Sequence, residues 1–199
     1  STVLDTSVWV EDVRYALVNP LSNSKNLLSQ NNPTFTSGTG WSGNSPCSGD
    51  GAGTYDLAVT HTADGSGSWK INACENGNNR MQTSSAITVP TAGDHTITFY
   101  VKGQVNQVIA PFYFVTGGSF IYSDEGDYTI QATGVWEKIV RTFTSLSAVN
   151  TSVRIRLKTA NSSVNIDDIS LVLTSDAELI NSRSAITTSI TSAAAGGWE

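Results

Sequence analysis

The chain contains 199 residues, of which 39% are hydrophobic and only 14% charged, and its formal net charge is −6. Eleven basic residues against seventeen acidic ones do not supply the dense positive field that nucleic-acid binding requires, and no apolar run approaches the length of a membrane span. Few charged side chains, with abundant Ser, Thr, Asn and Gly, favour strand surfaces and turns over helix surfaces, so the composition predicts an all-β fold.

The first 25 residues contain two apolar bursts, Val8–Val10 and Tyr15–Val18, separated by charged residues. They are compatible with an added strand, a short helix or a connector from an upstream domain. From Asn26 onward, short apolar or alternating segments are separated by turns rich in Gly, Ser, Asp or Asn. The segments predict strands at 55–60, 69–73, 87–89, 95–102, 108–115, 120–122, 128–132, 136–143, 153–158 and 164–173.

Strand signals at this spacing, with no helical crossover between them, predict an antiparallel β-sandwich or barrel rather than a parallel sheet. After Leu173 the composition shifts to Ser, Ala and Thr, which is typical of a linker or a frayed terminus. We therefore expect an N-terminal extension or connector at 1–25, one sandwich domain at 26–174, and a linker or C-terminal tail at 175–199.

Two cysteines, Cys47 and Cys74, lie in polar surroundings rich in Gly, Ser and Asn. They show no CxxC spacing and there is no second pair, which disfavours a zinc site and favours a disulfide between them. A disulfide indicates an oxidising compartment, so we expect a secreted or extracellular protein, with the cell surface as one setting. The absence of an N-terminal signal peptide is what a mature chain or an excised fragment would show.

The search for catalytic residues finds none that we would assign. The two histidines, His61 and His95, are far apart, and no nucleophile or nucleotide motif is present. Three acids, Asp124, Glu125 and Asp127, lie in a Gly-containing turn, where they are either ordinary exposed acids or a calcium-binding loop. We expect a non-enzymatic domain.

Asp167 and Asp168 are adjacent acids within an otherwise apolar strand segment. Because neighbouring strand residues point to opposite faces, at least one of these side chains is expected to be buried or at a sheet corner. A buried carboxylate needs a cation or several hydrogen-bond donors. Two alternatives stay open: a structural Ca²⁺ held by Asp167 and Asp168, or hydrogen bonds that tie down a loop.

The chain carries a series of motifs spread over 26–173, which are Asn26-Leu27-Leu28, Pro33-Thr34-Phe35, Gly40-Trp41, Gly53-Thr54-Tyr55, His95 to Lys102, Trp136-Glu137-Lys138 with Phe143, and Ile166 to Leu171. In their order and spacing these motifs resemble carbohydrate-binding modules of the related families four, nine, sixteen and twenty-two. The resemblance implies a galactose-binding-like jelly roll that binds polysaccharide and is fused to a secreted catalytic domain, a glycoside hydrolase or a polysaccharide lyase. In these families a Glu that helps to hold calcium commonly follows the first motif's Phe, whereas this chain has Thr36.

Sugar rings stack on aromatic side chains through their C–H faces, and their hydroxyl groups need planar polar partners. Alternation in 95–102 and 153–158 sends Tyr100, Arg154 and Arg156 to the non-core side, and Tyr113 alternates with its Phe neighbours in 108–115. We expect these three strands to form one binding platform. The resemblance adds a Trp after a Gly/Ser turn, and the complete predicted ligand-binding set is Trp69, Arg80, Gln82, Tyr100, Tyr113, Arg154 and Arg156.

The ligand class stays open between a neutral β-glycan, which is the family's default, and an acidic polysaccharide such as alginate, which the arginines would suit. A different class of function is also open. The sandwich is alternatively a structural or adhesive domain of a bacterial surface protein, with no exposed aromatic binding cleft.

Overall fold

The computed structural model describes residues 26–45, 47, 53–62, 66–89, 93–115, 120–146 and 150–174. The predicted N-terminal extension and C-terminal tail lie outside the described residues. Within the described ranges, no helix is long and apolar enough to cross a membrane.

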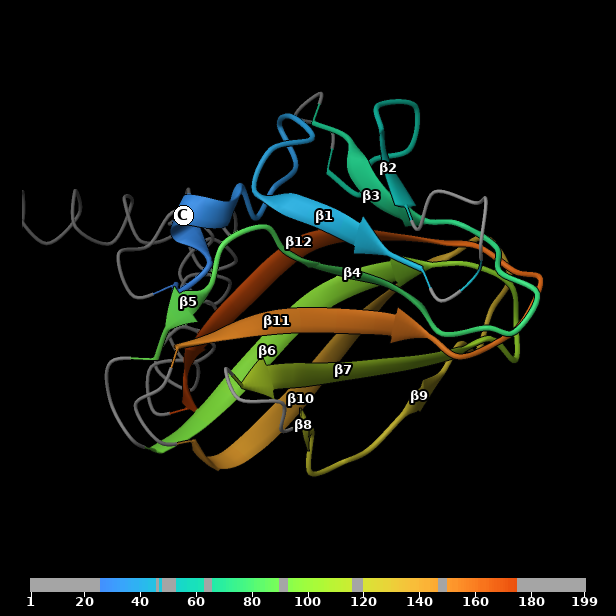
Figure 1. Cartoon of the computed structure of the whole chain (residues 1–199). Coiled ribbons are helices and arrows are strands. Elements are labelled where there is room, and N and C mark those ends of the chain that lie inside the picture. The colour runs from blue at the N-terminus through green and yellow to red at the C-terminus, as the bar shows by residue number, and fades with distance from the viewer. Residues whose placement is uncertain are drawn as a thin grey trace, which may run out of the picture.

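The described strands form two antiparallel sheets packed face to face, which confirms the predicted all-β sandwich of the jelly-roll type (Figure 1). The seven-stranded sheet has the order β1-β4-β11-β7-β8, with β5 paired to β11 and β9 paired to β7, and the five-stranded sheet has the order β10-β6-β12-β3-β2. A 3-10 turn, η1 (Ser29–Asn31), precedes the strands. The strand bounds are β1 Trp41–Asn44, β2 Gly53–Asp56, β3 Ser68–Ile71, β4 Asn79–Thr83, β5 Ile87–Thr88, β6 Gly93–Lys102, β7 Val108–Val115, β8 Phe120–Tyr122, β9 Tyr128–Thr129, β10 Trp136–Leu146, β11 Asn150–Leu157 and β12 Val164–Leu173.

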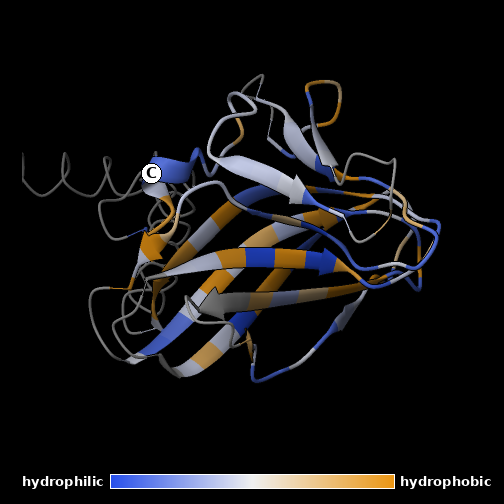
Figure 2. Cartoon of the chain, in the orientation of Figure 1, coloured by the Kyte–Doolittle hydropathy of each residue, from blue (hydrophilic) through white to orange (hydrophobic). Residues whose placement is uncertain are grey.

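The core lies between the sheets and follows the alternation of the strands. In β11, Val153, Ile155 and Leu157 are buried, while the residues between them point outward, and Figure 2 shows hydrophobic and hydrophilic residues alternating along this strand. In β6, Ile97, Phe99 and Val101 are buried in the same way. A period of two therefore divides each strand into a core side and an outer side.

Strand β12 is buried for most of its length because it lies between β6 and β3. Its register with β6 shifts between Asp167 and Ser170, and Asp168 has a left-handed φ of 48°. This irregularity is a β-bulge in the middle of the five-stranded sheet. It lets two consecutive acids leave the regular alternation of the strand.

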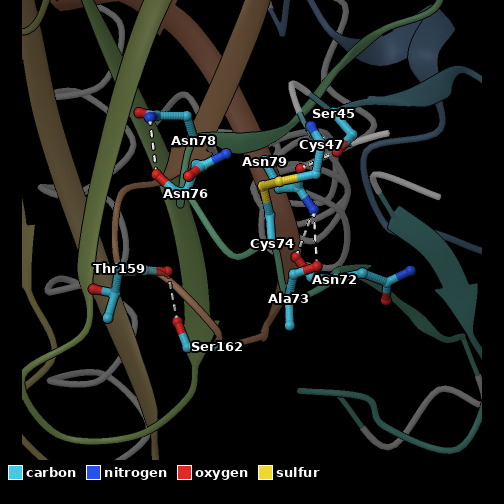
Figure 3. The surroundings of a disulfide bond; sticks show 10 residues. All are labelled: Ser45, Cys47, Asn72, Ala73, Cys74, Asn76, Asn78, Asn79, Thr159 and Ser162. Atoms are coloured by element: carbon cyan, nitrogen blue, oxygen red, sulfur yellow. Dashed lines mark hydrogen bonds between the residues drawn. A yellow bond between two sulfur atoms is a disulfide. The ribbon is translucent and has the colours of Figure 1, made fainter. Parts of the chain in front are cut away.

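Cys47 and Cys74 form the predicted disulfide, with their Cα atoms 6.0 Å apart. Next to it, the side chain of Asn79 donates hydrogen bonds to the carbonyl oxygens of Asn72 and Ala73 and accepts one from Ser45 Oγ (Figure 3). The disulfide and this buried amide together attach the segment after β1 to the connection between β3 and β4.

Candidate functional site

The outer face of the seven-stranded sheet collects polar and aromatic side chains from five strands. In the antiparallel register, Arg156 lies opposite Arg80 on one side and Ala110 on the other, and Arg154 lies opposite Gln82 and Phe112. Directly paired residues of neighbouring strands present their side chains on the same face. We call this surface the arginine–aromatic face, and define it by Ser42, Asn44, Arg80, Gln82, Ala110, Phe112, Phe120, Tyr122, Arg154 and Arg156.

One half of the arginine–aromatic face is made of planar polar groups. Arg80 Nη2 donates a hydrogen bond to Asn44 Oδ1 over 2.6 Å, and Arg154 Nε donates to Ser152 Oγ over 3.3 Å. Burial lowers the pKa of Arg80, and the nearby charge of Arg156 lowers it further. The pKa of Arg154 is lowered by burial and then by the charge of Arg80. The three guanidinium groups are therefore close enough to repel one another.

The other half of this face is an aromatic cluster on β7 and β8. The ring of Phe112 is only 1% exposed, because Phe120 and Tyr122 cover it with ring centroids 5.7 and 5.5 Å away. Phe120 and Tyr122 are themselves 50% and 47% exposed. The Arg156 guanidinium lies 5.4 Å from the Phe112 centroid and 5.8 Å from that of Tyr122. Arg156 therefore joins the polar half to the aromatic half through cation–π contacts.

The acidic turn between β8 and β9 lies beside this face and is fully engaged with its neighbours. Asp124 accepts a hydrogen bond from Thr144, and Glu125 accepts one from the Thr142 amide at 2.8 Å. Asp127 forms an ion pair with Lys158 over 2.5 Å. These contacts attach the turn to β10 and to the end of β11, which is the ordinary structural use of exposed acids.

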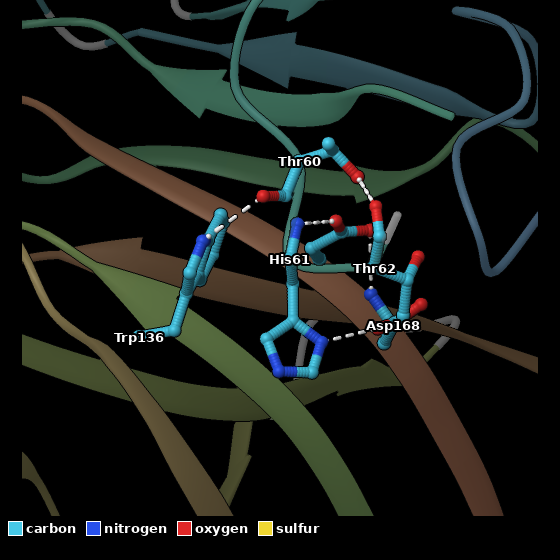
Figure 4. A network of polar contacts seen from close by, with 6 residues as sticks. Thr60, His61, Thr62, Trp136 and Asp168 are labelled. Carbon is cyan, nitrogen blue, oxygen red and sulfur yellow. Dashed lines mark hydrogen bonds and ion pairs between the residues drawn. The ribbon is translucent and has the colours of Figure 1, made fainter. Parts of the chain in front are cut away.

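Part of the outer face of the five-stranded sheet is covered by the chain itself. The loop 57–62 lies over β6 and β12, and the imidazole of His61 stacks on the ring of Tyr100 with centroids 3.6 Å apart and planes inclined by 19°. Trp136 Nε1 donates to the carbonyl oxygen of Thr60 over 3.1 Å and so fixes the loop from the other side (Figure 4). Tyr100 therefore has its ring face occupied by a residue of its own chain.

Asp167 and Asp168 lie beneath this loop and bind it. The His61 amide donates to Asp167 Oδ2 over 2.7 Å, His61 Nδ1 lies 2.6 Å from Asp168 Oδ2, and the Asp168 amide donates to Asp167 Oδ1 over 2.8 Å. Burial raises the pKa of Asp167 to about 6, and the charge of Asp168 raises it further. Of the two alternatives for these acids, the hydrogen bonds that tie down a loop are present.

This donor set does not fit a calcium site. Ca²⁺ requires six to eight oxygen ligands, whereas N–H groups and an imidazole address both oxygens of Asp167 and Oδ2 of Asp168. Thr36, which stands where the resembling families have Glu, uses its amide and hydroxyl to bind Asn32 Oδ1. Among the described residues, no group of three or more His, Cys, Asp or Glu could hold a metal ion.

Comparison with known proteins finds similarity only at the level of structure. No protein-family model matches the chain, and no curated protein matches its sequence. A family 61 carbohydrate-binding module in complex with β-1,4-galactotriose has a TM-score of 0.52 and 18% identity, covering 75% of this chain and 99% of that one. The family 22 xylan-binding domain of Paenibacillus barcinonensis Xyn10C has a TM-score of 0.52 and 12% identity, and the match covers 70% of this chain and 90% of that one.

A third structure, from Clostridium thermocellum xylanase Xyn10B, contains a family 22 module with a catalytic module and is complexed with xylohexaose. It has a TM-score of 0.55 and 11% identity, covering 71% of this chain and 28% of that one. The chain has the fold of a carbohydrate-binding module. At these identities the comparison concerns the fold, and the ligands belong to the proteins that were crystallised with them.

On this carbohydrate-binding-module fold, four of the predicted ligand-binding residues come together. Arg154 and Arg156 on β11 lie directly opposite Gln82 and Arg80 on β4, all on the arginine–aromatic face. Tyr113 lies on β7 opposite Val153 of β11 and Ile121 of β8, and its side chain lies outside the described residues.

The single platform predicted from three strands is wrong, because its strands belong to two sheets. Strand β6 with Tyr100 is in the five-stranded sheet, whereas β7 and β11 are in the seven-stranded one. The expected exposure of Trp69 is wrong as well. Trp69 is only 6% exposed and lies opposite Ile166 on β12, within the core cluster.

The aromatic half of the face is absent from the predicted ligand-binding set. Phe112, Phe120 and Tyr122 all belong to segments that were predicted as strands. The run Val108–Val115 is apolar at nearly every position, so alternation does not show which residues of this run point outward. The signal that could have found them is the hairpin pairing of β7 with β8, which sets Phe112 opposite Tyr122.

Proposed function

We propose that this chain is a non-catalytic module that binds polysaccharide on the arginine–aromatic face. The observation that carries the proposal is the position of two half-exposed rings, Phe120 and Tyr122, beside the planar polar side chains of Arg80, Gln82 and Arg156. A sugar ring can stack on an exposed aromatic ring, while guanidinium and amide groups form directed hydrogen bonds with its hydroxyls. Most ligand sites combine these two elements.

The setting follows from the fold and the disulfide. Modules of this fold occur beside a catalytic module in the xylanase Xyn10B structure, and we extend that arrangement to this chain as the attachment of a secreted polysaccharide-degrading enzyme to its substrate. The Cys47–Cys74 disulfide suits an oxidising, extracellular environment. The ligand is a neutral β-glycan or an acidic polysaccharide.

The first test is affinity electrophoresis of the purified chain through gels that contain laminarin, xylan, mannan, β-1,4-galactan or alginate. We expect retardation in at least one gel. Tyr122→Ala should weaken that binding by about ten-fold, since an exposed stacking ring contributes on the order of 1 kcal/mol beyond its buried area. Tyr122 is half exposed but covers one side of Phe112, so the thermal midpoint should fall modestly while the variant stays folded.

Val140→Ala is the matched control, because Val140 is 45% exposed on β10 of the other sheet. It removes a similarly exposed apolar side chain and should leave affinity unchanged. Unretarded migration in every gel would overturn the proposal and favour a structural or adhesive sandwich. Release of reducing ends by the isolated chain would show that the domain is catalytic.

A further inference from the structure

We propose that the ligand of the arginine–aromatic face is an anionic polysaccharide, whose carboxylate or sulfate groups bind Arg80 and Arg156 while its rings stack on Tyr122 and Phe120. This inference rests on the proposed function and narrows it to one chemical class. Two features support this class: the strand register sets two arginines opposite each other, and the ion pairs found among the described residues do not include them.

Arg80 and Arg156 occupy directly opposed positions on β4 and β11. Like charges that face each other across an antiparallel pair destabilise the sheet, and the two side chains lean apart. Arg80 donates to Asn44 on β1, and Arg156 lies over Phe112 and Tyr122 on the other side. Two cations kept together at this cost indicate a site that binds an anionic group.

Neither guanidinium has an acid to neutralise it within the described part of the chain. The ion pairs found there are His61–Asp168 and Lys158–Asp127. Lys158 is the informative contrast, because it follows Arg156 at the next outward position of the same stretch and has its own carboxylate. The acids of the neighbouring turn therefore bind Lys158 and β10, and the two opposed arginines have no carboxylate partner among the described residues.

The hydrogen-bonding capacity of these side chains is also unfilled. Nε of Arg80, Nε of Arg156 and Oε1 of Gln82 are shielded from solvent and have no hydrogen-bond partner in the described structure. Buried polar groups are normally paired in folded proteins, and exceptions often mark a ligand position. An oxyanion offers several acceptor oxygens, and the guanidinium fork matches the geometry of a carboxylate or sulfate group.

The overall charge of the chain implies that an anionic ligand can bind only at a local cluster of cations such as this face. With a net charge of −6, the protein as a whole repels a polyanion, so binding must come from a local cluster. The Arg156 guanidinium is within 5.8 Å of the Tyr122 ring centroid. A sugar stacked on Tyr122 would therefore place an acidic substituent on its own ring, or on the adjacent ring, close to Arg156.

The test compares alginate with alginate whose uronic carboxylates have been reduced to neutral hydroxymethyl groups, and with a sulfated galactan beside its desulfated form. Isothermal titration calorimetry at 50 mM and 300 mM NaCl measures affinity. We expect at least one charged polymer to bind ten-fold or more tightly than its neutral counterpart, with affinity falling as salt rises. The alginate pair reports a carboxylate ligand, and the galactan pair reports a sulfate ligand.

Arg80→Gln and Arg156→Gln should each lower the affinity for the charged polymer by about ten-fold or more, because each variant loses a charge-assisted hydrogen bond. Lys138→Gln, which removes one exposed cation from β10 on the other sheet, is the charge-matched control and should change affinity less than two-fold. Thermal midpoints verify folding. If a variant fails to fold, the comparison of each charged polymer with its neutral form, measured on the wild-type protein, decides the question.

Three outcomes separate the two proposals. Preference for a charged polymer, lost in both arginine variants, supports the inference. Equal or stronger binding of the neutral forms overturns the inference and leaves the proposed function intact. Absence of binding to all four of these polymers overturns the inference, and unretarded migration in every gel in addition overturns both proposals.

Discussion

Replacing Asp167 with Asn should change how the stability of the protein depends on pH. The Asp167 side chain is fully buried, and its pKa is raised from the ordinary 3.8 to about 6, first by burial and then by the charge of Asp168. The folded state therefore holds this proton more tightly than the unfolded state does. Folding is favoured by the protonated form, and stability is lost as pH rises from about 4 through 6.

The size of this effect follows from the difference between the two pKa values. At about 1.4 kcal/mol for each pH unit between them, ionising Asp167 costs the folded state up to about 3 kcal/mol above pH 6. The neutral amide introduced by Asp167→Asn has no charge to bury, and its carbonyl can still accept one of the two amide bonds from His61 and Asp168. Relative to wild type, the variant should gain up to about 3 kcal/mol between pH 4 and pH 7.5.

Urea unfolding of both proteins at half-unit steps from pH 4 to pH 8 measures this directly. His61, Asp168 and Tyr100 also face the site. Because the charges of Asp167 and Asp168 interact, the difference between the two proteins reports the titration of this pair of acids. If the free energies of unfolding of the two proteins changed in parallel with pH, the reasoning would be refuted. A difference of opposite sign, abolished by EDTA, would show a cation that favours ionised Asp167 and would reinstate a calcium site.

Two further predictions concern residues of the framework. The double variant Cys47→Ser, Cys74→Ser should lose about 3–4 kcal/mol of unfolding free energy, because the bond joins positions 27 apart in sequence; urea unfolding with and without reductant measures this, and an unchanged midpoint would contradict it. Trp69→Ala should lose about 3–5 kcal/mol, as expected for a buried Trp, while the folded protein keeps its polysaccharide affinity. Loss of affinity with unchanged stability would return Trp69 to the binding site.

The sequence supports strong conclusions about which side of a strand faces the core. In β6 and β11 the buried residues are those that alternation selects, and the outward residues include Tyr100, Arg154 and Arg156. A sandwich, however, has two outer faces, and alternation does not distinguish between them. Which face a residue reaches depends on the pairing of strands far apart in sequence, so Tyr100 was grouped with arginines that lie on the opposite surface.

Other errors have equally local causes. In Val108–Val115 nearly every residue is apolar, so alternation does not show which side chains point outward. The outward position of Phe112 follows only from the pairing of β8 with β7. Trp69 stands in a four-residue strand whose ends are also buried. A strand this short shows too little alternation to tell a core Trp from an exposed one, and its position after a Gly/Ser turn favoured the wrong choice.

The two outer faces of the sandwich differ in how the chain covers them, and this difference supports the proposed binding face. On the five-stranded sheet, the loop 57–62 supplies the partners itself: His61 stacks on Tyr100, and its amide and ring nitrogen bind the carboxylates of Asp167 and Asp168. On the seven-stranded sheet, among the described residues, no loop performs this role for Arg80, Arg156 and the exposed ring of Tyr122. Each sheet thus carries an aromatic ring beside charged groups, but within the described part of the chain only the first has a loop that supplies their partners. We therefore propose that a ligand supplies the partners of the second face, and that the opposed arginines select a ligand with negative charge.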